Sequence, residues 1–430
     1  MKTVVFLDSQ KSGSSREAIK AAEQLGYYTV LLTNRIKFIK ERKSNPDIHL
    51  IRLVDLANID DIRKALKLLR FKSLDICGII SFVDPYCHLA SQLATEFGVN
   101  HFSTEAIKNM EDKILSRKVL ANTSYSPHFL CIDNPSSVSD DEIESILPVI
   151  IKSPLSSGSK DVIKANNILE FKEFSKSLFD KYPDIPVLIE EFIDGPQYLT
   201  ECFMIEGKLH IIAIIEQEIT FFKRFIITGY NLLLHPTHDF YESLYTSIET
   251  ILQLHGMKNG TCHLEMRYVN NNWKVIEINP RISGGAMNKL LDSAFGINVV
   301  KETIKFAIGQ DPDISYRFKK HVFADYIVLS EKGILEKVIG RNRASRCPGV
   351  QHVYIRAKKG MTVQPPMSMG YRYAYIIATG STEEEARANA KYATSKIQFI
   401  LYPPQKKGFN MNSLKNLQWL PTKLIRQPFY

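Results

Sequence analysis

A polar turn between two alternating apolar runs is the feature that most constrains the fold of this chain. Residues 261–285 read TCHLEMRYVNNNWKVIEINPRISGG, and apolar positions alternate on both sides of the three asparagines. This pattern is typical of two antiparallel strands joined by a tight loop. If the turn is centred on Asn271, then Glu265 and Glu277 are equally far from it and lie opposite each other. The pattern therefore predicts two facing carboxylates on one hairpin.

Asn279 shares the face of the two glutamates, because residues two apart on a strand point the same way. Like charges directly opposite in a sheet are destabilising, so a cation is expected between them. Oxygen ligands without histidine or cysteine suit Mg²⁺, with Mn²⁺ as an alternative. The competing interpretation is an ordinary surface hairpin whose acids point to solvent.

The segment after the hairpin favours the metal interpretation. Arg281 is followed by Ser283-Gly284-Gly285, which places a cation beside a flexible turn. A transferring phosphoryl group needs such a combination of fixed positive charge and backbone N–H donors. The sequence therefore predicts a site for phosphoryl transfer.

The stretch HLEMRY…WKVIEINPRISGG resembles the metal-binding signature of the ATP-grasp carboxylate-amine ligases. Among the branches of this superfamily, the layout is most similar to the L-amino acid ligases, which make dipeptides, and to carnosine-synthase-like enzymes. Two features carry this similarity: the EINPR segment followed by a small residue and two glycines, and the segment ATGSTEEEARANAKYA at residues 378–393, which resembles the closing strand and helix of carboxylase-like ATP-grasp enzymes.

The resemblance implies an α/β ATP-grasp fold in three parts. The first part, residues 1–105, would be a parallel α/β pre-ATP-grasp domain, and its strand, loop, helix and strand order supports this independently. Residues 106–310 would form the nucleotide-binding core, with subdomains at about 106–185 and 186–310. Residues 311–430 would form an α+β domain that ends in a basic tail.

A strand at residues 149–151 delivers Lys152 and leads into a serine- and glycine-containing loop with Ser157, Gly158 and Ser159. Such a loop can close over phosphates through amide and hydroxyl donors while a lysine supplies a point charge. A strand that leads into an ordinary polar turn is the competing interpretation. The pattern of a lysine on a strand followed by this loop also resembles the phosphate-binding motif of the family.

Two further segments of the chain match motifs of the family that it resembles. Residues 103–120 are expected to form one helix, and Lys113 on it matches the family's lysine that contacts the α-phosphate. The segment VLIEEFIDGPQY, residues 187–198, matches the strand that reads adenine. A glutamate is usual where this chain has Gln197, which can still bond to ribose hydroxyls. The implied nucleotide contacts in this segment are Glu190, Glu191, Phe192, Ile193 and Gln197.

The resemblance implies ATP and Mg²⁺ as cofactors and a reaction through an acylphosphate. Arg281 and the N–H groups near Gly284 and Gly285 could stabilise the oxyanion that forms when an amine attacks. Alternatively, Arg281 is a salt-bridge partner of the two glutamates. Two other functions stay open: a carboxylase or purine-pathway relative that acts through carboxyphosphate or formyl phosphate, and a nucleotide-binding module without turnover.

Composition excludes several other classes of protein. The net charge of +9 is spread over the chain, with a good part in the tail from Gln405, so it does not define a nucleic-acid site. No apolar run approaches the ~20 residues of a membrane span. The six cysteines lack CxxC pairs, which favours reduced thiols over a zinc site or a disulfide scaffold. We therefore expect a cytoplasmic enzyme with small-molecule substrates, and a homodimer is compatible with these features.

Overall fold

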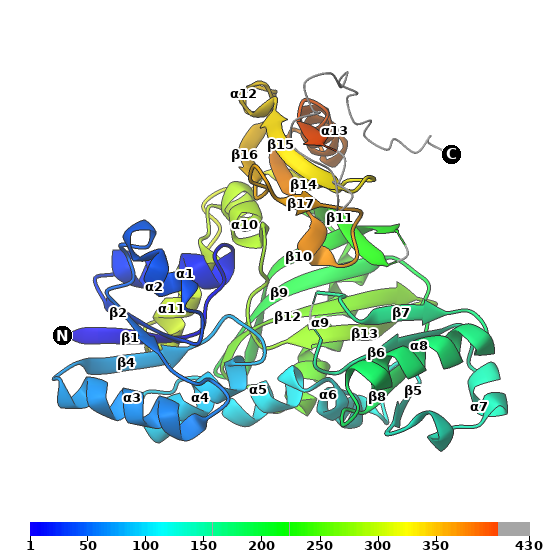
Figure 1. Ribbon diagram of the computed structural model, residues 1–430, viewed down its shortest axis with the longest axis horizontal. Helices are drawn as coiled ribbons and strands as arrows, with labels where there is room; N and C mark the ends of the chain where they lie inside the picture. Colours follow the sequence, from blue (N-terminus) through cyan, green and yellow to red (C-terminus); the bar gives the residue numbers. More distant parts are fainter. Residues whose placement is uncertain (157, 223, 403–430) are drawn as a thin grey trace, which may run out of the picture. The chain divides into compact units, whose positions relative to one another are not determined.

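The chain begins with a parallel β-sheet, as its alternation of apolar strands and amphipathic helices predicts. A computed structural model describes residues 1–402 except 157 and 223 (Figure 1). The first sheet has the strand order β3-β2-β1-β4, and β1 pairs in parallel with both β2 and β4. Its strands are β1 (Lys2–Leu7), β2 (Tyr28–Thr33), β3 (Leu50–Leu53) and β4 (Asp75–Ile80).

Helices cover both faces of this sheet, which explains why Val4, Val5, Phe6 and Leu7 are all buried although neighbouring residues of a strand face opposite sides. Helices α3 and α4 pack on one face, and α1 and α11 lie toward the other (Figure 1). The helices and short turns of this region are α1 (Ser14–Gln24), α2 (Lys37–Lys40), η1 (Arg42–Ser44), α3 (Ile59–Phe71), α4 (Cys87–Glu96) and, from later in the chain, α11 (Val299–Ala307).

The single helix predicted for residues 103–120 is wrong, because Asp112 divides it into α5 (Thr104–Glu111) and α6 (Lys113–Leu120). The Asp112 carboxylate accepts hydrogen bonds from the backbone N–H groups of Ile114 and Leu115. Aspartate is among the strongest N-cap residues, so it starts a new helix here in spite of the continuous apolar spacing. Lys113 is consequently the first residue of α6.

An antiparallel sheet follows, in which β5 (Phe129–Ile132) and β6 (Val149–Lys152) both pair with β8 (Val187–Glu191). Helix α8 (Ile168–Lys181) packs on it through Phe171 and Leu178. Because β6 and β8 are antiparallel, Glu190 pairs with Ile150, so Lys152 lies two residues along β6 from this pair and on the same face of the sheet. The remaining elements of the region are η2 (Pro135–Ser137), α7 (Asp140–Glu144) and β7 (Val162–Ala165).

The hairpin predicted from the three asparagines is formed by β12 (Gly260–Val269) and β13 (Asn272–Asn279). Its turn consists of Asn270 and Asn271, both with positive φ, rather than being centred on Asn271. Glu265 nevertheless faces Glu277, because the register shifts by one residue between Glu265 and Met266. The predicted opposition of the two acids is confirmed, and the bulge compensates for the shorter turn.

Strand β12 also pairs with β9 (Gln197–Ile205), so the hairpin continues into a wider antiparallel sheet. After the hairpin the chain forms α10 (Met287–Phe295) and then α11. Helix α9 (His238–Leu254) precedes the hairpin, and its Ser243 hydroxyl accepts a hydrogen bond from Trp273 Nε1 of β13. Strand β10 (Lys208–Phe221) follows β9 in the sheet order.

The chain divides into two compact units, and the elements above belong to the first, apart from β7 up to Lys164 and the part of β10 from Glu216 onward. The second unit holds residues 156–164, 216–234 and the described residues from 319 onward. In it α13 packs on β14 and β18, where Ala386 and Ala390 contact Phe323. Its elements are β11 (Phe225–Leu232), β14 (His321–Ile327), β15 (Gly333–Ile339), α12 (Arg341–Ala344), β16 (Val350–Ile355), β17 (Thr362–Val363), η3 (Met369–Tyr371), β18 (Ala374–Gly380), α13 (Glu383–Thr394) and β19 (Gln398–Tyr402).

Two expectations from composition concern the whole fold. All six cysteines are free thiols, and Cys87, Cys202 and Cys262 are buried. Among the described residues, every helix is too short or too polar to cross a lipid bilayer.

Candidate active site

The two facing glutamates of the hairpin lie within a network of charged and amide side chains. Lys113 Nζ lies 3.0 Å from Glu277 Oε1. Gln197 Nε2 donates a hydrogen bond of 3.0 Å to Glu265 Oε2. Burial alone would raise the pKa of Glu277, but the charge and hydrogen bond of Lys113 together with the charge of Lys152 outweigh it and lower that pKa to about 2. Glu277 is therefore ionised at neutral pH and presents oxygen donors that suit a hard cation.

Asn279, the third proposed metal ligand, lies in a row of polar residues across three strands. His263 pairs with Asn279 on one side and with Glu201 on the other. Burial, reinforced by the charge of Arg281, lowers the pKa of His263 to about 4. The neutral ring lies 2.8 Å from the Arg281 carbonyl oxygen through Nδ1, so we assign the proton to Nδ1. His263 thus fixes the backbone that carries Arg281.

The turn after Arg281 is held by a buried acid that the sequence did not assign to the site. The backbone N–H of Ser283 donates to Glu201 Oε1 at 3.0 Å, and the Ser283 hydroxyl donates to the same oxygen. Burial raises the pKa of Glu201 to about 7, and the hydrogen bonds from Ser283 oppose this rise. Gly285 follows with φ +68°, and a Cβ on Gly13 would lie 3.3 Å from its nitrogen. The backbone around Gly284 and Gly285 is therefore constrained from two sides.

The proposed phosphate lysine of β6 belongs to a buried network of three charges. Lys152 Nζ lies 2.7 Å from Glu190 Oε2, and Arg117 Nε donates to Glu190 Oε1 at 2.6 Å. Burial lowers the pKa of Lys152 to about 8, although the charge of Glu190 opposes this. Burial disfavours ionisation of Glu190 too, but Arg117 and Lys152 hold its pKa below the usual value.

Arg117 is a site residue that the sequence analysis left without a role. Its Nη2 donates to the carbonyl oxygens of Val275 and Ile276, at 3.1 and 2.7 Å. These carbonyls lie at the bulge of β13, where the ladder is locally interrupted. The available signal was the position of Arg117 shortly after Lys113, within the segment that resembles the family. Arg117 connects α6, the hairpin and β8.

In the segment proposed to read adenine, some backbone N–H and carbonyl groups form hydrogen bonds within the protein. Glu191 N–H donates to the His128 carbonyl, and Phe192 N–H donates to the Pro148 carbonyl. Arg267 Nη1 donates to the Ile193 carbonyl, and Arg267 Nε donates to Gln197 Oε1 at 3.1 Å. Gln197 therefore lies between Arg267 and Glu265. The contacts of Glu191, Phe192, Ile193 and Gln197 with a nucleotide stay predictions.

Arg281 does not pair with the two glutamates, so that alternative prediction is wrong. Its ion-pair partner is Asp84, which follows β4: Arg281 Nε donates to Asp84 Oδ1 at 2.9 Å, and Nη2 donates to Oδ2. The loop that follows β4 and the turn that follows β13 meet in the folded chain, and no local pattern in the sequence indicates this.

Of the proposed phosphate loop, Ser157 lies outside the described residues. Gly158 and Ser159 both have positive φ, 65° and 58°, and belong to the second compact unit. Within that unit, the N–H of Met369 donates to the Gly158 carbonyl at 3.1 Å. The phosphate-binding roles of this loop stay predictions.

Two family domains match this chain. Residues 145–289 match the ATP-grasp domain, and residues 325–402 match the L-amino acid ligase C-terminal domain 2. The chain therefore contains an ATP-grasp domain, and it has the mixed α/β ATP-grasp fold that the sequence predicted. Its C-terminal region matches an L-amino acid ligase C-terminal domain, so the predicted resemblance is confirmed at the level of domains.

Two relatives align with most of the length of this chain. The uncharacterized protein y4rH of Sinorhizobium fredii (strain NBRC 101917 / NGR234) is 26% identical over 81% of this chain and 73% of its own length. The L-arginine-specific L-amino acid ligase of Bacillus subtilis is 17% identical over 71% of this chain and 78% of its own length.

The L-amino acid ligase from Bacillus licheniformis has a similar crystal structure, with a TM-score of 0.80, 17% identity and coverage of 94% of this chain and 99% of that one. The biotin carboxylase domain of Hydrogenobacter thermophilus 2-oxoglutarate carboxylase, crystallised with MgADP and bicarbonate, gives a TM-score of 0.66 at 17% identity and covers 92% and 90%. At such identities the two structures establish the fold alone.

Proposed function

We propose that this protein is an ATP-dependent ligase that joins two amino acids. It would phosphorylate the carboxylate of an L-amino acid and couple the resulting acylphosphate to the amine of a second amino acid, giving a dipeptide, ADP and phosphate. The observation that carries this proposal is the match of residues 325–402 to the L-amino acid ligase C-terminal domain 2, because it follows an ATP-grasp domain in the same chain.

The donor set of the hairpin fits a magnesium ion. Glu265 and Glu277 face each other, Asn279 follows on the same strand as Glu277, and all three side chains supply oxygen. These residues would hold Mg²⁺, which supplies neutralisation of the negative charge that accumulates on a transferring phosphoryl group. Lys113 and Lys152, both in contact with acids of this site, would bind phosphate oxygens of ATP as point charges.

The first proposed step forms a bond between a carboxylate oxygen of the substrate and the γ-phosphorus of ATP, and it breaks the bond from that phosphorus to ADP. In the second step the neutral amine nitrogen attacks the acyl carbon, and the carbon–oxygen bond to phosphate breaks. The amine loses one proton to the departing phosphate or to water. Arg281 and the backbone N–H groups of Gly284 and Gly285 would stabilise the oxyanion between these events.

A second candidate function is carboxylation or a purine-pathway-like reaction through carboxyphosphate or formyl phosphate. The similarity in fold to a biotin carboxylase domain favours it. The test compares ADP release by the purified chain with pooled L-amino acids, with bicarbonate plus biotin, and with purine precursors. Stimulation of ADP release by amino acids supports the ligase. Stimulation by bicarbonate plus biotin, without stimulation by amino acids, supports the carboxylase.

A further inference from the structure

Asp84 forms a bidentate ion pair with one edge of the Arg281 guanidinium. The two hydrogen bonds from Nε and Nη2 form a fork on a single carboxylate. Both side chains are partly accessible, with 21% of Asp84 and 17% of Arg281 exposed, so the pair borders solvent rather than filling the core. A bidentate fork fixes the plane of the guanidinium as well as its position.

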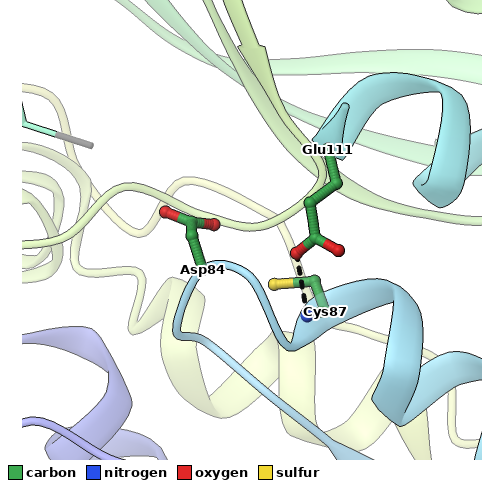
Figure 2. Close-up of side chains that lie close together, drawn as sticks. All are labelled: Asp84, Cys87 and Glu111. Carbon is green, nitrogen blue, oxygen red and sulfur yellow. Dashed lines mark hydrogen bonds between the residues drawn. The ribbon is translucent and has the colours of Figure 1, made fainter. Parts of the chain in front are cut away.

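The position of Asp84 is itself fixed on both sides. The N–H of Tyr86 donates to the Val83 carbonyl at 2.8 Å, which closes a turn around Asp84. Glu111 then holds the helix that follows: one carboxylate oxygen accepts from the N–H of Cys87 at 2.9 Å (Figure 2). The other oxygen accepts from the N–H of His88 at 3.0 Å. A carboxylate at this helix N-terminus is favoured because it satisfies free backbone donors.

Asp84, Cys87 and Glu111 lie close enough to resemble a metal site, since one ligand atom of each falls within 4.8 Å of the others. Figure 2 shows the three side chains close together on the loop after β4, at the start of α4 and at the end of α5. However, the oxygens of Asp84 accept from Arg281, and those of Glu111 accept from backbone N–H groups. The cluster is better explained as a scaffold that holds the Asp84 carboxylate in place.

This scaffold determines which donors of Arg281 remain for a substrate. A guanidinium has five N–H groups. Within the part of the chain that the structure describes, Asp84 takes two and the Ile282 carbonyl takes one from Nη1, at 3.2 Å. One N–H on Nη1 and one on Nη2 then remain. These two donors are suited to a planar or tetrahedral anion, such as the carboxylate and phosphate groups of an acylphosphate.

We propose that Asp84 is a positioning residue that presents this pair of Arg281 donors to the reacting acyl group, with Glu111 holding Asp84 in turn. The inference rests on the proposed function, in which Arg281 stabilises the oxyanion that forms when the amine attacks the acylphosphate. It adds that the N-terminal parallel domain sets the orientation of that arginine. Asp84 acts through Arg281 and touches no substrate itself.

A double-mutant cycle tests this positioning role. Asp84→Asn keeps the shape of the side chain but loses its charge and one acceptor, and we expect kcat to fall on the order of 10- to 100-fold with the KM for ATP unchanged. Arg281→Ala should lower kcat at least as much. The double variant should be no slower than Arg281→Ala alone, because Asp84 has no other route to the reaction.

The matched control is Asp47→Asn, which breaks another aspartate fork on an arginine, Arg16, in the same parallel domain. It should leave kcat unchanged. The positioning role is overturned if the effects of Asp84→Asn and Arg281→Ala multiply in the double variant, or if Asp84→Asn alters kcat no more than Asp47→Asn does.

A binding measurement separates this inference from the proposed function. Phosphonoacetate, a stable compound with a carboxylate and a phosphonate like an acylphosphate, is titrated into the protein with MgADP. We expect Asp84→Asn to weaken its binding and to have no further effect in the Arg281→Ala background, whether or not amino acids stimulate turnover. Equal binding to wild type and Asp84→Asn would overturn the inference, whereas absence of amino-acid-dependent turnover would overturn only the proposed function.

Discussion

Lys113 and Glu277 form an ion pair, with Nζ 3.0 Å from Oε1. The side chain proposed to bind phosphate therefore contacts a side chain proposed to bind the metal ion. Lys152 is close enough that its charge also lowers the pKa of Glu277. The two lysines and the acid thus belong to one electrostatic unit, in which a change at any member should affect both nucleotide and metal binding.

The metal assignment predicts that Glu277→Gln abolishes most turnover. The amide keeps the size of the side chain but removes the charge that would hold Mg²⁺, so we expect kcat to fall by about 10²-fold or more. Circular dichroism and the melting temperature should show an intact fold. Glu242→Gln, on the exposed side of α9, is the matched control and should keep full activity. Near-normal activity of Glu277→Gln would refute the metal assignment.

The phosphate assignment predicts that Lys152→Ala weakens ATP binding. A hydrogen bond to a charged group contributes roughly 1.5–3 kcal/mol, so the Kd for ATP should rise about 10- to 100-fold. Glu190 keeps Arg117 as its partner in this variant, which protects the fold. Isothermal titration with MgATP measures the effect, and Lys176→Ala on the exposed face of α8 serves as the control. Unchanged ATP affinity would show that Lys152 is purely structural.

The contacts of Arg117 predict that its removal lowers the stability of the fold and not only the affinity for nucleotide. Removing it leaves Glu190 with one cation and leaves the carbonyls of Val275 and Ile276 without their donor. Breaking a buried ion pair costs about 3–5 kcal/mol, so Arg117→Met should lower the free energy of unfolding by that amount in urea denaturation. Arg117→Lys restores the charge without the fork and should recover part of the loss. A shift below about 1 kcal/mol would contradict the role of this network.

The raised pKa of Glu201 predicts that the stability of the fold depends on pH in a specific direction. Its pKa is raised from 4.5 to about 7 by burial, so between these values the folded state holds a proton that the unfolded state has lost. The stabilisation is therefore complete below pH 4.5 and is lost as the pH rises through 7. Its loss should amount to about 3 kcal/mol.

The measurement is the difference in free energy of unfolding between wild type and Glu201→Gln, taken from pH 5 to pH 8. We expect the advantage of wild type to shrink as the pH rises. His263 has a lowered pKa and an opposite dependence, but it is common to both proteins and cancels in the difference. A difference that is constant over this range would mean that Glu201 titrates normally.

Patterns local in the sequence predicted the elements and one central relationship of the site. Strand alternation was sufficient to place Glu265 opposite Glu277, even though the turn has two residues and a bulge follows. The break at Asp112 was missed because its N-cap bonds compete with an uninterrupted helical spacing.

Pairs between distant segments could not be predicted in this way. Asp84 and Arg281 are separated by 197 positions, and Arg117 and Glu190 by 73. Such contacts depend on how whole domains pack, and no periodicity in either segment records the partner. For this reason the sequence identified the residues expected to carry the chemistry but not Asp84, which we propose orients one of them, nor the pairing of Glu190 with Lys152 and Arg117.

The most direct test of the central claim is the product formed from ATP and amino acids. Purified protein is incubated with MgATP and pooled L-amino acids, ADP and phosphate are measured, and the mixture is searched for dipeptide masses. The proposed function predicts one dipeptide for each ADP and phosphate, with Glu277→Gln inactive. Release of ADP with bicarbonate but not with amino acids, or no new dipeptide mass, would contradict it.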